Sequence, residues 1–125
     1  MTFTPDNFTV WTEIPVTDMD RAVGFYNQVF NTELKMDDTG PNPMAIFPTG
    51  DDTGVAGHLY PGTPAPTDTG PTIHMVVPDR LEDALDRLKT AGGEVLSEPI
   101  AIPPGRFAYC RDLDGNSIGL FSYNA

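Results

Sequence analysis

An internal repeat restricts the fold of this chain more than any other feature of its sequence. Residues 10–26 have the pattern of a strand, a tight turn and an amphipathic helix, and residues 72–88 repeat that order. At a constant offset of 62 residues, Met19 coincides with Leu81, Ala22 with Ala84, Val23 with Leu85, Tyr26 with Leu88 and Gly57 with Gly119. The chain is therefore predicted to contain two similar halves, and function is expected between them.

The first half is predicted to fold as β-α-β-β-β. Side chains alternate over residues 8–16, which indicates a strand with Trp11 and Glu13 on one face, and Pro15 favours an edge position because it cannot donate to a ladder. Asp18 is a suitable N-cap for a helix that ends near Phe30. Three strands are predicted to follow, at residues 33–36, 44–48 and 55–60, with a hairpin loop at residues 49–54.

The second half is predicted to repeat this order. Its strand at residues 72–77 precedes a helix that Asp79 caps, with Glu82 in a capping-box position. Two glycines at residues 92–93 end that helix. The remaining predictions are strands at residues 94–96, 107–111 and 117–122, a proline-containing loop at 99–105 and a turn at 112–116.

A proline-rich connection separates the halves. Residues 61–71 contain four prolines and no large aliphatic residue, which is typical of an extended linker. We therefore expect one α+β domain over residues 1–125, with module one at about 8–60, the linker at 61–71 and module two at about 72–123. The two repeated β-α-β-β-β modules would enclose a cleft between curved sheets.

Charge and composition restrict the class of partner. The formal net charge of −11 argues against binding to nucleic acid or to an anionic membrane. The chain lacks a signal-peptide pattern at its start and an apolar run long enough to span a bilayer, so a soluble, cytoplasmic protein is predicted. Cys110 is the single cysteine and is expected to be a small buried residue.

Three segments resemble the vicinal oxygen chelate superfamily, which includes glyoxalase I, bleomycin resistance proteins and extradiol dioxygenases. They are residues 14–30 (IPVTDMDRAVGFYNQVF), 91–95 (AGGEV) and 107–118 (FAYCRDLDGNSI). Leu113 replaces a proline that the family favours in the last of them. The resemblance implies paired modules around a cleft, and many small members of the family are homodimers.

The resemblance also implies where a metal would bind. Metal-dependent members carry one ligand on the first and one on the last strand of each module. By spacing from the capping aspartate and from the last turn, these positions fall at Trp11, Ile73, Gly57 and Gly119. None of these side chains offers a metal a lone pair, so no metal is predicted and no cofactor is expected.

Glu13 and His58 are the candidate catalytic residues. Glu13 shares the cleft-facing side of its strand with Trp11, where shelter would suit an acid or base, although a salt bridge or a solvated acid is an equal alternative. Strand alternation predicts that His58 and His74 point away from the cleft, unless a bulge at Gly57 shifts the register and turns His58 toward Glu13.

The predicted ligand-binding residues are mainly apolar and aromatic, as in pockets for small molecules. The two glycines among them either leave room for a ligand or allow close packing. The set is Trp11, Glu13, Gly57, Ile73, Met75, Tyr109, Gly119 and Phe121.

Three hypotheses follow from these residues. The first is a homodimeric protein that binds a small apolar or aromatic molecule between its modules without a metal. The alternative is a lyase, isomerase or dioxygenase-like enzyme that uses Glu13 and a non-standard divalent metal site. A structural dimer without a ligand is the third.

Overall fold

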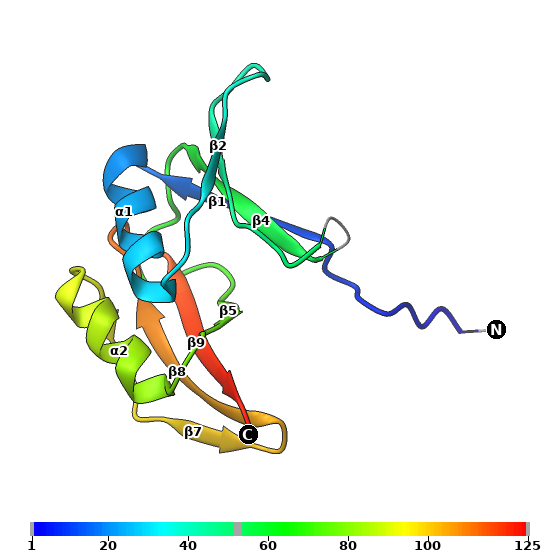
Figure 1. Ribbon diagram of the computed structural model, residues 1–125, viewed down its shortest axis with the longest axis vertical. Coiled ribbons are helices and arrows are strands. Elements are labelled where there is room, and N and C mark those ends of the chain that lie inside the picture. The colour runs from blue at the N-terminus through cyan, green and yellow to red at the C-terminus, as the bar shows by residue number, and fades with distance from the viewer. Residues whose placement is uncertain (1, 52–53, 125) are drawn as a thin grey trace.

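The first module folds as the sequence predicts. In the computed structural model, which describes residues 2–51 and 54–124, its elements are β1 (Trp11–Val16), α1 (Met19–Phe30), β2 (Lys35–Asp37), β3 (Met44–Ile46) and β4 (Ala56–Pro61). The strands form a sheet in the order β1-β4-β3-β2 (Figure 1), in which β1 runs parallel to β4 and the other pairs are antiparallel. The edge position predicted for the Pro15 strand is thus confirmed, whereas the hairpin loop at 49–54 includes residues 52–53, which lie outside the described residues.

The second module contains one strand more than predicted. Its elements are β5 (Ile73–Val76), α2 (Leu81–Thr90), β6 (Glu94–Val95), β7 (Ile100–Ile102), β8 (Gly105–Arg111) and β9 (Ser117–Tyr123). The sheet order is β5-β9-β8-β6, and β7 pairs with β8. The prediction of a loop throughout residues 99–105 is therefore wrong, because the prolines flank β7 and leave its three residues free to pair.

The two helices begin in different ways. In α1 the Asp18 carboxylate accepts a bond of 3.1 Å from the backbone N–H of Arg21, as the sequence predicts, and Asn31 ends the helix with a φ of 49°. In α2 the N-cap is Arg80, which makes no side-chain capping bond, so the prediction that Asp79 caps this helix is wrong. Asp79 instead accepts two bonds of 2.7 and 2.9 Å from Arg87, in the last turn of the helix.

The hydrophobic core lies between each helix and the sheet of its own module, and it continues where α1 contacts α2. Arg87 of α2 joins the helices by donating a bond of 2.9 Å to the carbonyl of Val29, near the end of α1. The largest fully buried side chains are Tyr26, Ile14, Leu59, Leu81, Leu88, Ile118, Leu120, Val16, Val29 and Cys110. The expectation that Cys110 is buried is therefore confirmed.

The internal repeat is present in the burial pattern of the strands, but at an offset of 61 residues. Glu13 pairs with His58 across β1 and β4, and His74 pairs with Gly119 across β5 and β9. At this offset, Glu13 of module one is equivalent to His74 of module two, and His58 is equivalent to Gly119. At this offset, buried Val16 coincides with buried Val77.

The helices keep the offset of 62, because Arg80 is an additional residue between the capping aspartate position and the start of α2. Since side chains in a strand alternate between faces, a shift of one residue moves every side chain to the other face. An offset of 62 for the whole chain therefore assigns the wrong face to β4, which contains Gly57, and to β5, which contains Ile73. This error bears directly on the candidate site.

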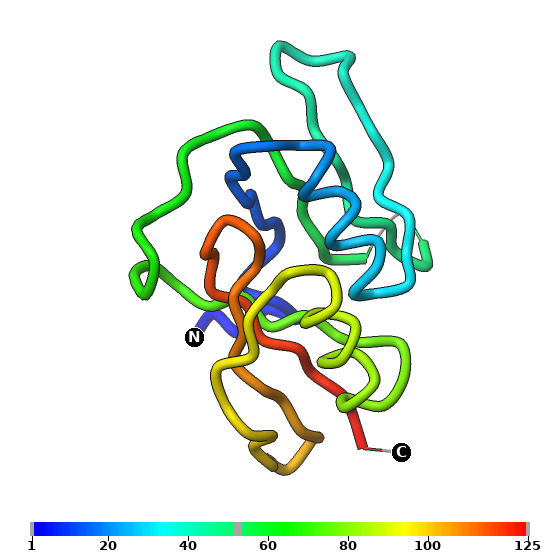
Figure 2. The backbone as a smooth tube through the Cα atoms, turned by 90° about the vertical axis from the view of Figure 1, so that its left-hand side faces the viewer, coloured from blue at the N-terminus to red at the C-terminus, as the bar shows by residue number. Residues whose placement is uncertain are grey.

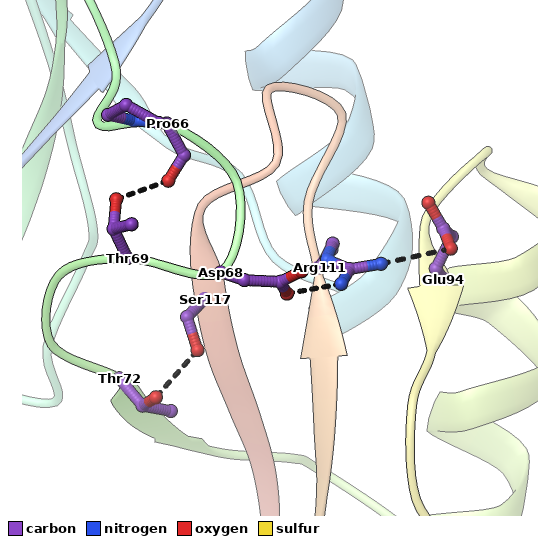
Figure 3. A network of polar contacts seen from close by, with 7 residues as sticks. All are labelled: Pro66, Asp68, Thr69, Thr72, Glu94, Arg111 and Ser117. Carbon is purple, nitrogen blue, oxygen red and sulfur yellow. Dashed lines mark hydrogen bonds and ion pairs between the residues drawn. The ribbon is translucent and has the colours of Figure 1, made fainter.

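The connection between the modules is tied to module two. Residues 62–72, which contain no helix or strand, run along the outside of the molecule (Figure 2). Arg111 on β8 pairs with Asp68 of the connection and, at 3.3 Å, with Glu94 (Figure 3). The hydroxyls of Thr72 and Ser117 lie 2.6 Å apart and hold the end of the connection against β9.

The N-terminal residues extend away from the body of the molecule (Figure 1). Within the described part of the chain, neither helix has the length and apolar composition that crossing a membrane requires.

Candidate functional site

A partly open groove of about 1140 Å³ lies between the two modules. One wall comes from β1 and the residues before and along β4, and the other comes from β5 and its flanks. The side chains along it are mostly apolar, among them Trp11, Phe47, Val55, Met75 and Val76. The groove therefore has the composition of a small-molecule site.

Both strands that flank the groove are edge strands. In the described chain β1 pairs with β4 and β5 pairs with β9, and neither has a partner on its other side. An edge strand presents backbone N–H and C=O groups in a row that no ladder satisfies. Polar atoms are consequently available beside an otherwise apolar surface, which allows a bound molecule to be oriented as well as buried.

Trp11, His58 and Glu13 form a chain of polar contacts at the edge of this groove. The indole Nε1 of Trp11 donates a hydrogen bond of 2.9 Å to Nδ1 of His58. On the other side of the imidazole, Nε2 lies 3.4 Å from Oε1 of Glu13. Because the indole only donates, Nδ1 must accept, and a neutral His58 then carries its proton on Nε2, facing the carboxylate.

His58 lies on the sheet face of Trp11 and Glu13, opposite to the face that strand alternation predicted. The register pairs Glu13 with His58, so both side chains stand on the same face of the sheet, without a bulge at Gly57. The His58 side chain is 8% exposed and does not itself line the groove, whereas the Glu13 side chain is 68% exposed. His58 thus supports Trp11 and Glu13 from beneath and leaves the carboxylate accessible.

His74 is the counterpart of Glu13 in module two, and its expected orientation is also wrong. Its ring stands on the exposed face of β5, with ring centroids 4.9 Å from Phe107 and 5.8 Å from Tyr109. It also lines the groove. The motif Val-x-Asp, which occurs at residues 16–18 and again 61 positions later at residues 77–79, is the sequence signal that would have found it.

Two predicted binding residues point to the opposite face from His74. Ile73 and Met75 stand with buried Ile118 and Leu120 on the side of α2, although they still contribute to the wall of the groove. Both are partly buried against the core. Their apolar side chains therefore serve packing as well as the groove.

The two glycines lie in tightly packed places. A Cβ atom on Gly57 would lie 2.1 Å from the backbone oxygen of Thr12, and one on Gly119 would lie 2.1 Å from Nδ1 of His74. Of the two alternatives for these glycines, the structure shows close packing. Gly57 nevertheless lies along the groove.

The structure divides the predicted ligand-binding residues into two groups. Trp11, Glu13, Gly57, Ile73 and Met75 line the groove. Tyr109, Gly119 and Phe121 lie on the exposed face of the second sheet and do not line it. Residues that the sequence did not indicate also line the groove, including Thr9, Phe30, Thr32 and Pro48. Most of them belong to loops or helix ends, where no periodic pattern marks a site. A ligand-binding role for either group stays a prediction.

Comparison with known proteins decides the family. Residues 9–120 match the Glyoxalase/Bleomycin resistance protein/Dioxygenase superfamily. The chain belongs to this superfamily. No curated protein sequence matches it.

Solved structures of the superfamily share the fold of this chain. TnmS3, an antibiotic binding protein from Streptomyces sp. CB03234, is 26% identical over 98% of this chain and 100% of its own, with a TM-score of 0.62. A glyoxalase/bleomycin resistance protein from Albidiferax ferrireducens is 17% identical over 94% of this chain and 100% of its own, with a TM-score of 0.67. A glyoxalase I variant from Zea mays is 17% identical over 90% of this chain and 44% of its own, with a TM-score of 0.69.

The metal positions of the superfamily can now be assigned by face as well as by spacing. Trp11 and Gly119 keep their assignments, while the offset of 61 moves the other two from Ile73 to Thr72 and from Gly57 to His58. His58 is a possible ligand, but its Nδ1 lone pair accepts from Trp11. Neither an indole nor a glycine offers a side-chain lone pair.

The donor set therefore does not fit the divalent metal of the superfamily. Over residues 2–51 and 54–124, no three His, Cys, Asp or Glu side chains are grouped so that they could hold a metal ion. The remaining position, Thr72, has its hydroxyl in contact with Ser117.

Proposed function

We propose that this superfamily member binds a small apolar or aromatic molecule in the groove between its modules, without the divalent metal of its relatives. The observation that carries this proposal is the groove itself, a space of about 1140 Å³ bounded by two edge strands and by an indole that is 46% exposed. An exposed indole is costly to leave in water, and a flat apolar ligand would cover it.

Two further observations support the proposal. The chemistry of the donor set at the superfamily's metal positions is unsuited to a metal, as Trp11 and Gly119 illustrate. One structural relative of the chain is described as an antibiotic binding protein. A groove of this size accommodates a drug-sized or metabolite-sized molecule.

Calorimetric titration with 1-naphthylmethanol, an uncharged aromatic probe, tests the proposal. We expect saturable binding that Trp11→Ala weakens by on the order of tenfold, because the stacking surface is lost. Met36→Ala removes a different exposed apolar side chain, on β2, and should leave the affinity unchanged. Absence of binding, or equal affinity in the Trp11 variant, would contradict the proposal. Stoichiometric metal in protein purified without a chelator would contradict its metal-free part.

The proposal includes a homodimer. One face of the second sheet carries a row of exposed apolar side chains, and such patches mark interaction surfaces. Its most exposed members are Val76 at 58%, Tyr123 at 67%, Ile102 at 40%, Ile100 at 38% and Tyr109 at 38%. A second copy could bury the same face isologously.

The oligomeric state can be tested by light scattering coupled to size exclusion. A charge at Tyr109, introduced by Tyr109→Asp, should convert a dimer to a monomer, because the carboxylate would be buried without a partner. Met36→Asp places the same charge on a 58% exposed methionine of the first sheet and serves as the matched control. A wild-type monomer at micromolar concentration would exclude this part of the proposal.

Proton transfer is a second candidate function, which the contact of 3.4 Å between Glu13 and His58 favours. In this case Glu13 would act as the base of an isomerase or lyase, and His58 would position its carboxylate. Glu13→Gln would then abolish turnover of a bound molecule while leaving its binding, whereas a binding protein would show no turnover before the substitution.

A further inference from the structure

The charge of the groove is concentrated in one side chain. Among the described residues that line it, Glu13 is the sole side chain with a formal charge at neutral pH, and no lysine or arginine is present. The nearest cation in the same row of the sheet is Lys35 on β2, which lies beyond His58 and Ile46 and does not line the groove. A ligand in the groove therefore meets a single negative charge on an apolar wall.

The carboxylate of Glu13 is arranged to accept a further hydrogen bond. An ionised carboxylate has two oxygens and only accepts. In this structure Oε1 lies 3.4 Å from His58, and the side chain as a whole remains 68% exposed. The imidazole cannot turn its other nitrogen toward Glu13 without giving up the bond of 2.9 Å from Trp11. Because Glu13 lines the groove, the acceptor capacity that remains on its carboxylate is available to a molecule bound there.

Trp11, like Glu13, attracts positively charged groups. Trp11 is 46% exposed and lies beside Glu13 on the same face of β1. The face of an indole carries negative charge density and attracts cations more strongly than other aromatic side chains do. A carboxylate and an indole face at one end of an apolar groove together select a positively charged donor attached to an apolar body.

We propose that the groove recognises ligands that carry a protonated amine next to a flat aromatic group, with Glu13 as the residue that determines this specificity. The inference rests on the proposed function, since it requires that the groove bind aromatic molecules at all. The ammonium group would donate to Glu13 and lie over the face of Trp11. The aromatic body would extend along the apolar wall formed by residues such as Phe47 and Met75.

Three probes of similar shape and different charge test the inference by calorimetry: 1-naphthylmethylamine, which is protonated at neutral pH, neutral 1-naphthylmethanol and anionic 1-naphthoate. The amine is expected to bind about tenfold more tightly than the alcohol, and the carboxylate more weakly than both. Glu13→Gln should reduce the preference for the amine over the alcohol to within about twofold.

A matched variant separates a specific contact from the general attraction of an acidic protein. Asp86→Asn removes the same charge from a side chain that is 76% exposed on α2, where it faces Lys89 at 3.7 Å and lies outside the groove. This variant should keep the full preference for the amine. An equal loss in both variants would overturn the inference, as would equal affinities of the wild type for amine and alcohol. Failure of all three probes to bind would instead contradict the proposed function itself.

Discussion

The hydroxyl of Tyr26 in the first module donates a hydrogen bond of 2.7 Å to Oδ2 of Asp112 in the second. Both residues are buried, and the bond joins α1 to the turn between β8 and β9. Burial is the main cause that raises the pKa of Tyr26 well above its ordinary value, and the Asp112 charge adds to it. The other oxygen of Asp112 accepts bonds of 2.9 Å from the backbone N–H groups of Asp114 and Asn116. This carboxylate therefore shapes its own turn and fixes the turn to the other module.

Tyr26→Phe should lower the free energy of unfolding by about 1–3 kcal/mol, because a hydrogen bond to a buried charged group is lost while the ring stays packed. Urea denaturation followed by circular dichroism measures the change. Tyr123→Phe removes a hydroxyl from a residue that is 67% exposed and should have little effect. Equal stability of the two variants would show that the bond between the modules contributes nothing.

Gly119→Ala should destabilise the protein by about 1–3 kcal/mol, the usual cost of overpacking, because its Cβ would lie 2.1 Å from the His74 ring. The double variant Gly119→Ala/His74→Ala should recover most of this loss, since the obstacle is a side chain. Gly57→Ala offers no such relief, because the obstacle is the Thr12 backbone oxygen at 2.1 Å. Thermal melting of the three variants checks this order of stability.

The ion pair between Glu82 and Arg106 should make the stability of the folded protein depend on pH in the acid range. Arg106 donates two bonds of 2.8 and 2.9 Å to Glu82 and is the main cause that lowers the pKa of this carboxyl from 4.5 to about 2. A pKa depressed by folding stabilises the native state above the unfolded value and ceases to do so as the pH falls through about 2. Between pH 4.5 and 2, the wild type should therefore lose stability more steeply than Glu82→Gln. Parallel curves in denaturant titrations across this range would contradict the assignment.

Cys110 should be inert in the folded protein. Its side chain is fully buried, and burial raises the pKa of the thiol to about 11, so the reactive thiolate is scarce at neutral pH. Ellman's reagent at pH 8 should react with this thiol slowly in native protein and at once in denaturant. Fast labelling of native protein would mean that β8 opens readily.

Much of the architecture could be predicted from the sequence because its signals are local. The stripe of apolar residues and the capping aspartate predicted both ends of α1, Met19 and Phe30, to within one residue. β7 was missed because its three residues lie between prolines, and a strand that short is stabilised by its partner β8 rather than by its own pattern. For α2, the capping-box pattern was present, but Arg87 competes successfully for the Asp79 carboxylate.

The candidate site was less predictable, because one residue decides which face of a strand a side chain occupies. The additional residue before α2 shifts the helices relative to the strands, so a single offset for the whole chain assigned Gly57 and Ile73 to positions that His58 and Thr72 occupy. The bond from Trp11 to His58 joins residues 47 positions apart and has no local sequence signal. Burial of Val16 and Val77 provides the reference that fixes the faces.

The contact between Gly119 and His74 has a consequence for which side chains position 119 can acquire. The imidazole occupies the volume that the first carbon of any side chain at position 119 requires, at 2.1 Å from Nδ1. A single substitution that installs a carboxylate there meets a steric barrier, and replacement of His74 alone leaves a bare glycine in the strand. A metal ligand at position 119 would therefore require a change at His74 as well as at Gly119.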